Sequence, residues 1–306
     1  IHKQEDINKF VGGIPFFLVS YSHFGPEHVK GHHKHIATDM DPVSTAKNQS
    51  FYYHICKAVY GTHVSSWNRE IERIGLTGGH WLLSNVMFMY FLMHCCLWAF
   101  TYLAFGKGGL WFHTLYTIAG LFWVEAINYL EHYGLRRDKE GDVFEAVNGF
   151  HSWNAPASTC GAKISATPIT TATAGANQIL QHFKDVPMLP YEYIICILLS
   201  LNPPLWYYVM NPKVDAVMRA KRGEMLDGEE DQWNRSMPLS KADRFRDLVV
   251  KFYLSILTLG LSYLTFGMEY SIEGRLWSNL EPIKYRIKLR QLWPLIFILK
   301  GFWGFG

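Results

Sequence analysis

Histidines cluster in two short segments of the sequence. The first segment reads Glu27-His28-Val29-Lys30-Gly31-His32-His33, and the second reads Asn128-Tyr129-Leu130-Glu131-His132-Tyr133-Gly134-Leu135. If the first segment is helical, His28 and His32 lie on one face, and His33 lies about 100° around the axis from His32. Neutral imidazole binds iron, copper, nickel and zinc, so this array predicts a metal site without naming the metal.

The first cluster is difficult to explain by packing alone. Three protonated imidazoles at this spacing would repel one another, and three buried neutral ones would each need a hydrogen-bond partner. Metal binding removes both difficulties. The isolated histidines near apolar segments are instead expected to be interfacial or hydrogen-bonded polar residues, and these are His54, His63, His80, His94 and His113.

Two glutamates and a glycine accompany the histidines. Glu27 and Glu131 could fix the tautomers of neighbouring imidazoles or could ligate metal directly, and the sequence leaves both open. Gly31 lowers helix propensity by roughly 1 kcal/mol, which predicts the close approach of another helix or of a metal at this position.

Long apolar segments separate the clusters. The 306 residues are 49% hydrophobic and only 18% charged, and a helix needs roughly 20 residues to cross a bilayer. The sequence therefore predicts an all-α, polytopic membrane helical bundle, with a turn at Gly106-Lys107-Gly108-Gly109. Its expected spans are 82–105, 110–129 and 191–210, the last of them broken by Pro203-Pro204. A shorter candidate is 252–268, and 10–20 is expected to be the end of a further span.

The charges and cysteines limit the class of protein. A net charge of +3 is too small to indicate a nucleic-acid partner, and the basic residues follow the spans. By the positive-inside tendency, these segments and the histidine clusters are expected to face the cytoplasm. The five cysteines contain no CxxC pair, which favours a reduced compartment over a disulfide framework or a zinc knuckle.

Several regions outside the clusters also carry expectations. The stretch 68–74 has the spacing of a short surface helix, and 292–306 is interrupted by Pro294 and Lys300, which favours an interfacial tail. The absence of an initiator Met and of a signal peptide predicts that the sequence starts inside a longer protein.

The two clusters together resemble one family. Glu27-His28-x-x-Gly31-His32-His33, followed by Ala37-Thr38-x-Met40-Asp41-Pro42, is similar to the second histidine box of the alkane 1-monooxygenases in the fatty acid desaturase superfamily. Asn128-Tyr129-x-Glu131-His132-Tyr133-Gly134-Leu135 resembles the motif that separates these hydroxylases from desaturases. His151-Ser152-Trp153-Asn154 also matches, and the similarity runs to Val209-Met210-x-Pro212-Lys213-Val214.

The resemblance implies a membrane hydroxylase domain over 1–214 and a C-terminal extension over 215–306. It implies a cytoplasmic di-iron site with two iron ions and a rubredoxin-type electron donor. The implied reaction uses O2 to hydroxylate the terminal carbon of an alkane or acyl chain. The motif-matched ligands are His2, His28, His32, His33 and His132, and the supporting residues are Glu27, Glu131 and His151. His35 is a further candidate contact.

The sequence departs from the family pattern in two places. The first box reads His-Glu-x-x-His-Lys in the family, and His2-Lys3 matches only its end. After Asn154 the family carries Gln-Arg-His-x-Asp-His-His, whereas 155–176 here is rich in Ala and Thr and has no histidine. The codons of 164–171, read two bases out of frame, can encode the missing box, so we interpret 156–176 as a frameshifted translation that the coding DNA would test.

Two alternatives follow from these departures. A centre that lacks three or more imidazoles is expected to bind iron weakly, so the chain could be an inactive fragment or a pseudoenzyme. Within enzymes, the alternative is a lipid desaturase, although Glu131-His132-Tyr133-Gly134 favours a hydroxylase. The apolar side chains of 82–129 could line a substrate channel or face lipid, and the sequence favours neither.

Overall fold

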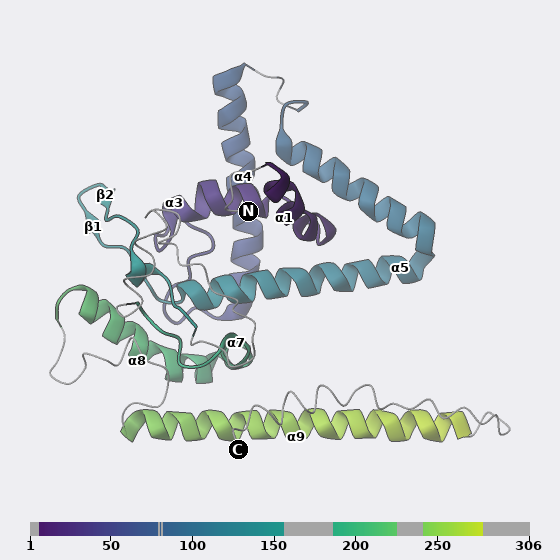
Figure 1. Ribbon diagram of the computed structural model, residues 1–306, viewed down its shortest axis with the longest axis vertical. Coiled ribbons are helices and arrows are strands. Elements are labelled where there is room, and N and C mark those ends of the chain that lie inside the picture. The colour runs from purple at the N-terminus through teal and green to yellow at the C-terminus, as the bar shows by residue number, and fades with distance from the viewer. Residues whose placement is uncertain (1–5, 79, 81, 156–185, 225–240, 278–306) are drawn as a thin grey trace. The chain divides into compact units, whose positions relative to one another are not determined.

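The computed structural model describes residues 6–78, 80, 82–155, 186–224 and 241–277. Most of these residues are helical (Figure 1), which confirms the all-α expectation apart from one small hairpin. The chain divides into a unit of residues 1–250 and a unit of residues 251–306. The described residues of both histidine clusters lie in the first unit.

The first cluster is carried by a chain of short helices that packs on a long one. The elements are α1 Asp6–Leu18, α2 Phe24–Glu27, the π-helix η1 His28–His32, α3 His33–His35 and α4 Phe51–Thr77. α4 starts where the Ser50 side chain accepts a hydrogen bond from the Tyr53 amide, and it ends at Gly78 with φ 68°. It packs against α2 and α5.

The predicted short helix over 68–74 is helical but is only the end of α4. The prediction of its length was wrong because a buried stripe extends the helix toward its N-terminus. The stripe repeats every three or four residues and consists of Phe51, His54, Ala58, Thr62 and Ser66.

The second cluster ends the longest helix, α5 Val86–His132. Asn85 caps its start by accepting from the amides of Met87 and Phe88. Gly106 interrupts it with φ 63° and ψ −157°, a conformation that is accessible almost only to glycine. Figure 1 shows α5 bent sharply into two arms, so the spans predicted at 82–105 and 110–129 are confirmed as two apolar helical arms joined at one residue rather than by a four-residue turn.

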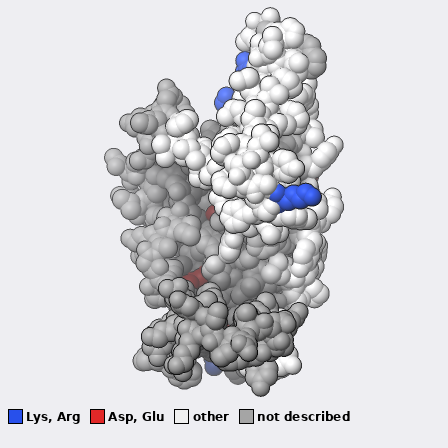
Figure 2. All heavy atoms as spheres, turned by 90° about the vertical axis from the view of Figure 1, so that its right-hand side faces the viewer, with Lys and Arg blue, Asp and Glu red and all other residues white. Residues whose placement is uncertain are grey.

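Two of the described helices are long and apolar enough to cross a membrane, namely α5 and the 243–264 part of α9 Lys241–Trp277. In both, only 11% of the most apolar window is buried. Figure 2 views the side toward which the α5 bend points, and its described surface carries few charged residues. The exposed side chains of α5 include Phe100, Leu103, Phe105, Trp111, Phe112, Leu115 and Ile118. Most of the arms' apolar side chains therefore face outward.

The break expected at Pro203-Pro204 is confirmed, but 191–210 is not among the described helices that are long and apolar enough to cross a membrane. The chain forms α7 Tyr193–Ser200 and α8 Pro203–Lys221, separated where Asn202 caps α8 and Pro203 and Pro204 open it. α7 has only 8 residues, too few for a span. Both helices instead bury side chains within the first unit, including Cys196, Leu199, Trp206, Val209 and Met210.

The segment after α5 returns toward the histidines. It forms the hairpin β1 Lys139–Glu140 and β2 Val143–Phe144, and then the 3-10 helix η2 Gly149–His151.

The expected helix at 252–268 is confirmed within α9. α8 continues through 214 and 215, where the sequence resemblance ends. His2, the anomalous 156–176 stretch and the 292–306 tail lie outside the described residues.

Candidate metal centre

A π-turn brings the histidines of the first cluster together. Residues 27–33 are helical, but the central part, η1, is wound as a π-helix, and the His33 amide donates to the His28 carbonyl. This winding places residues five apart on one face, so the Nε2 atoms of His28 and His33 lie 3.2 Å apart. The His28 ring also stacks on the His32 ring, with 5.2 Å between centroids. All three imidazoles therefore share one side of the helix.

Asp41 orients the innermost of these imidazoles. The Nδ1 atom of His32 lies 2.8 Å from Asp41 Oδ2, and both side chains are almost fully buried. A hydrogen bond from Nδ1 to the carboxylate leaves the lone pair of His32 on Nε2, the atom that is free to ligate. Asp41 belongs to a motif in the sequence, but its role beside His32 was not predicted.

The loop around Asp41 fixes that carboxylate. The Ser44 hydroxyl donates to Oδ2 at 2.6 Å, and the Val43 amide donates to Oδ1 at 3.1 Å. Burial alone would raise the pKa of Asp41, but the charge and hydrogen bond of His32 and the hydrogen bond of Ser44 hold it well below its usual value. The pKa of His32 is raised despite its burial, chiefly because of Asp41.

His132, at the end of α5, presents a bare nitrogen toward the same region. Its Nδ1 lies 3.2 Å from the backbone carbonyl of His151, so Nδ1 carries the proton. Its Nε2 is buried and has no hydrogen-bond partner among the described residues. The His132 ring lies 4.7 Å from the His32 ring, measured between centroids. An imidazole lone pair without a hydrogen-bond partner, beside the His32 ring, is available to bind a metal.

The side chain of His151 does not face His132. Its Nε2 lies 3.1 Å from Glu145 Oε1, and its Nδ1 accepts from the Asn148 amide. Burial lowers the pKa of His151, although Glu145 acts in the opposite direction. Glu145 in turn pairs with Lys221 of α8. His151 therefore supports His132 through its carbonyl, and sequence reasoning missed Glu145, which holds that segment in place.

Glu27 and Gly31 lie on the opposite face of the same helix. Glu27 is buried, accepts a 2.7 Å hydrogen bond from the Ser66 hydroxyl and forms an ion pair with Arg69. A Cβ on Gly31 would collide with the side chains of Glu27 and Arg69. The close approach predicted at Gly31 is therefore made by α4, and the observed contacts of Glu27 anchor η1 to that helix.

Glu131 is held by side chains from other segments. Its carboxylate accepts a 3.0 Å hydrogen bond from the Tyr193 hydroxyl of α7, and its backbone carbonyl accepts from the Trp153 amide. The Trp153 indole donates to the Tyr133 carbonyl, so the motif around Trp153 caps the exposed carbonyls at the end of α5. Gly134 follows with φ 74°, where a Cβ would strike Val214.

The described residues do not complete a metal site by themselves. Among them, no three His, Cys, Asp or Glu side chains are placed to hold one metal ion by themselves. The structure brings His28, His32, His33 and His132 together, while His2 lies outside the described residues. The Nε2 atoms of His28 and His33 lie within hydrogen-bond distance of each other, at 3.2 Å. The same separation suits two nitrogens that bind one metal with bonds of about 2.1 Å at an angle near 100°. These donors therefore fit a metal.

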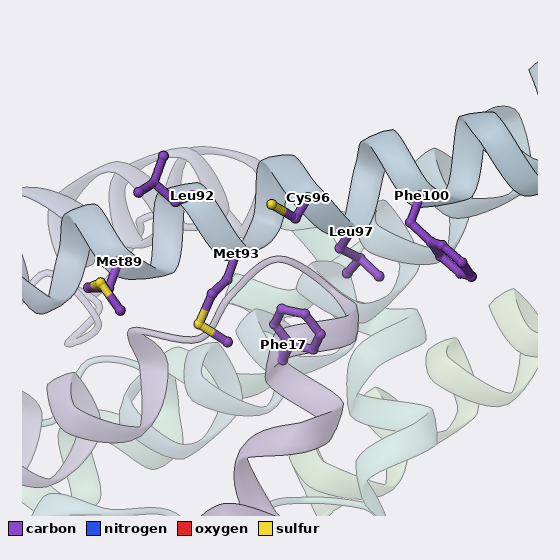
Figure 3. Close-up of a pocket in the computed structure, with 7 residues that line it drawn as sticks. All are labelled: Phe17, Met89, Leu92, Met93, Cys96, Leu97 and Phe100. Atoms are coloured by element: carbon purple, nitrogen blue, oxygen red, sulfur yellow. The ribbon is translucent and has the colours of Figure 1, made fainter.

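An apolar groove lies along the first arm of α5. The groove has a volume of about 440 Å³. Figure 3 shows Phe17 of α1 below this arm, with Met93 and Leu97 pointing toward it. The residues from α5 are Met89, Leu92, Met93, Cys96, Leu97 and Phe100. The isolated histidine next to it, His94, is bonded to the Ser22 hydroxyl at 2.8 Å, as expected for a hydrogen-bonded polar residue.

Known proteins match this chain over most of its length. It is 33% identical over 236 residues to alkane 1-monooxygenase 2 of Alcanivorax borkumensis, which covers 75% of this chain and 62% of that protein. It is 32% identical to alkane 1-monooxygenase 2 of Pseudomonas aeruginosa, over 74% of this chain and 62% of that protein. The xylene/toluene monooxygenase hydroxylase component XylM of Pseudomonas putida is 29% identical over 61% of this chain.

These matches confirm the resemblance to alkane 1-monooxygenases. The chain spans 62% of the length of the two alkane monooxygenases. The model of the fatty acid desaturase family matches residues 1–161, a range that includes both histidine clusters and His151. The chain therefore belongs to the fatty acid desaturase family.

Proposed function

We propose that this chain is a membrane di-iron monooxygenase that hydroxylates the terminal carbon of an alkane or a related acyl chain. The observation that carries the proposal is the convergence of His28, His32 and His33 with the orphaned Nε2 of His132. The matching alkane 1-monooxygenases support the same reaction. The cofactor is two iron ions, and the electron donor is of the rubredoxin type.

The residues that would hold iron are the five motif-matched histidines. His28, His32, His33 and His132 supply imidazole nitrogens, and His2 is assigned by its motif alone. Asp41 and the His151 carbonyl each bind an Nδ1 atom, which directs the Nε2 lone pairs toward the centre. In this proposal Glu131 supports His132, and Glu27 keeps the π-turn seated on α4.

The fold supports a multi-pass arrangement with the centre facing the cytoplasm. Basic residues follow the end of α5 and of α8, and Lys221 donates to the Arg136 carbonyl at 2.9 Å. Arg137 reaches the Lys34 carbonyl beside the first cluster. The two basic segments and the histidines therefore share one end of the first unit, as the positive-inside tendency requires.

The reaction consumes RH, O2, two electrons and two protons and yields ROH and H2O. Bound iron supplies the redox chemistry that activates O2. The chain itself fixes the tautomer of each imidazole, excludes water by burying His32 and His132, and presents apolar helix surface to a hydrocarbon. The groove beside Phe17 offers only apolar contacts, which suits an alkyl chain.

The test uses the full chain purified from membranes. Iron per chain is measured first, and the protein is then incubated with a medium-chain alkane, O2, rubredoxin and its reductase. We expect two irons per chain and a primary alcohol as the product. The variant His132→Ala is expected to lose both, whereas His80→Ala, outside the centre, retains them.

Three outcomes would contradict the proposal. A wild-type chain that binds no iron would identify an inactive fragment or pseudoenzyme. An alkene product would identify a desaturase. Iron bound equally by the wild type and by His132→Ala would place the metal elsewhere.

A further inference from the structure

A second buried polar cluster lies beside the histidine centre and contains none of its ligands. The Tyr21 hydroxyl donates to Glu125 Oε1 at 2.9 Å, and Glu125 Oε2 lies 3.4 Å from His54 Nε2. All three side chains are fully buried, although they come from three separate segments of the chain. The packing of apolar helices does not require such a cluster, since burying a carboxylate and an imidazole together is unfavourable.

The cluster is continuous in both directions. Toward the surface, the Tyr21 hydroxyl lies 3.0 Å from Thr62 Oγ1, which lies 3.3 Å from His23 Nε2. The His23 ring packs 3.7 Å from the ring of His63, an exposed residue on α4. A hydrogen-bonded series of groups that can each accept and donate a proton therefore runs inward from His23, and the ring of His23 contacts an exposed histidine.

The inner end reaches the helix turn that carries His132. His54 Nδ1 lies 2.7 Å from the Thr45 hydroxyl, and the Thr45 carbonyl accepts from the Gly134 amide. Glu125 stands seven residues before His132, so both occupy one face of α5 about two turns apart. The side-chain series thus ends at the Thr45 hydroxyl, and the backbone of the same residue is bonded two residues beyond His132, so the cluster lies beside the centre without contributing a ligand to it.

We propose that Tyr21, Glu125 and His54 form a proton path that serves oxygen reduction at the neighbouring metal centre. The inference rests on the proposed function, because only a reaction that reduces one oxygen atom to water consumes two protons per turnover. Tyr21 passes its hydroxyl proton to Glu125, Glu125 passes one to His54 Nε2, and His54 passes its Nδ1 proton to the Thr45 hydroxyl, which releases its own proton toward the centre. Thr62 replaces the proton of Tyr21 and takes one from His23, which regains it from the side of His63. One proton has then moved inward, and rotation of the hydroxyls and of the His54 ring returns the groups to their starting orientations.

The side chains are suited to these roles. Hydroxyl hydrogens rotate between acceptors, and Thr62 Oγ1 has three partners within reach, namely Tyr21, His23 and the Ala58 carbonyl. Burial, followed by Glu125, raises the pKa of Tyr21 well above its ordinary value, so its hydroxyl keeps a proton at rest. His54 Nε2 has no hydrogen-bond partner within the described part of the chain, and Glu125 is the carboxylate that it faces.

The experiment measures proton uptake rather than turnover. The iron-loaded full chain in lipid nanodiscs is reduced anaerobically by two electrons, and proton uptake is followed by stopped flow with a pH-indicator dye. Glu125→Gln keeps the shape of the side chain, and Tyr21→Phe removes a single oxygen. Both are expected to slow proton uptake at least about tenfold with iron content unchanged, and to release more of the O2 consumed as hydrogen peroxide.

A matched control is His113→Gln. His113 is also buried on α5 and hydrogen-bonded, to Thr101 and to the Leu18 carbonyl, but it lies outside the path. Its variant should take up protons at the wild-type rate. Wild-type uptake in either Glu125→Gln or Tyr21→Phe, or loss of iron in both variants, would overturn the path and leave the proposed function standing. A wild-type chain that binds iron but forms no alcohol rejects the proposed function instead, while proton uptake still tests the path.

Discussion

The Nε2 atoms of His28 and His33 lie 3.2 Å apart because the helix that carries them is wound as a π-turn. With regular α-helical winding these residues, five apart, would point in different directions. The pair is therefore expected to ligate one iron ion. His28→Ala and His33→Ala should each lower iron content at least about tenfold, measured by elemental analysis of purified protein.

The control for this pair is His35→Ala, two residues beyond His33. The bonds that join His35 to Thr38 are made by the His35 backbone carbonyl, so the substitution leaves them in place. It should retain iron. Equal iron loss in His35→Ala and His33→Ala would show that the effect is general to the segment.

Asp41 should matter for metal affinity as well as for folding. Asp41→Asn removes the charge that orients His32 and weakens the hydrogen bonds from Ser44 and Val43. We expect iron affinity to fall about 10-fold to 100-fold, and the free energy of unfolding to fall by about 1–3 kcal/mol. Competition with an iron chelator and chemical unfolding in detergent measure the two effects. Asp39→Asn, an exposed neighbour, is the control, and an equal effect there would refute the role of Asp41.

A substitution at Gly31 tests how closely the face of η1 opposite the histidines packs against α4. Gly31→Ala places a methyl group against Glu27 and Arg69, so the free energy of unfolding should fall by about 1–3 kcal/mol. Gly75→Ala on α4 meets no neighbouring atom and should be neutral or stabilising by up to about 1 kcal/mol. Thermal unfolding of both variants provides the comparison. A neutral Gly31→Ala would mean that α4 is not packed closely at this point.

The bend of α5 depends on one residue. Gly106→Ala forces a side chain into a backbone conformation that disfavours it, and we expect a loss of about 1–3 kcal/mol in the free energy of unfolding. Gly108→Ala, two residues later, has open space and a φ outside the left-handed region, so it should not destabilise the protein. If both substitutions have the same effect, the bend is not fixed at Gly106.

His23 predicts a specific dependence of stability on pH. Burial, with nearby His63 and His94, lowers the pKa of His23 from 6.5 to about 3. The unfolded chain therefore binds the proton more readily between these values, and the stabilisation is complete above about pH 6.5 and lost as the pH falls toward about 3. Relative to His23→Gln, the wild type should lose up to about 1.4 kcal/mol per pH unit below about 6.5.

Chemical unfolding of the wild type and His23→Gln between about pH 7.5 and about pH 5 measures this difference. The comparison cancels the contributions of the other histidines that both proteins share. A stability difference that stays constant over this range would show that His23 is accessible to protons in the folded protein.

Much of the fold follows from local patterns in the sequence. The apolar runs on either side of Gly106 predict two helical arms. In an apolar environment a helix pairs its own backbone N–H and C=O groups, whereas an irregular segment leaves them unpaired. The sequence predicted the break at Pro203-Pro204. It did not predict that Trp206 and Met210 after the break are buried, because their burial depends on neighbouring segments. The length of α4 was missed because its buried stripe is polar as often as apolar.

The sequence by itself determined the family, through the motifs at 27–33 and 128–135 that resemble it, and that resemblance gave the candidate ligands. The crowding of imidazoles in the first motif predicted a shared metal without naming it. The tertiary structure alone decided how they are oriented. His28 meets His33 through the π-winding of the backbone. Asp41 meets His32, and the His151 carbonyl meets His132, across intervening segments of the chain. Hydrogen bonds of this kind depend on a few tenths of an ångström, and spacing along the chain does not specify such distances.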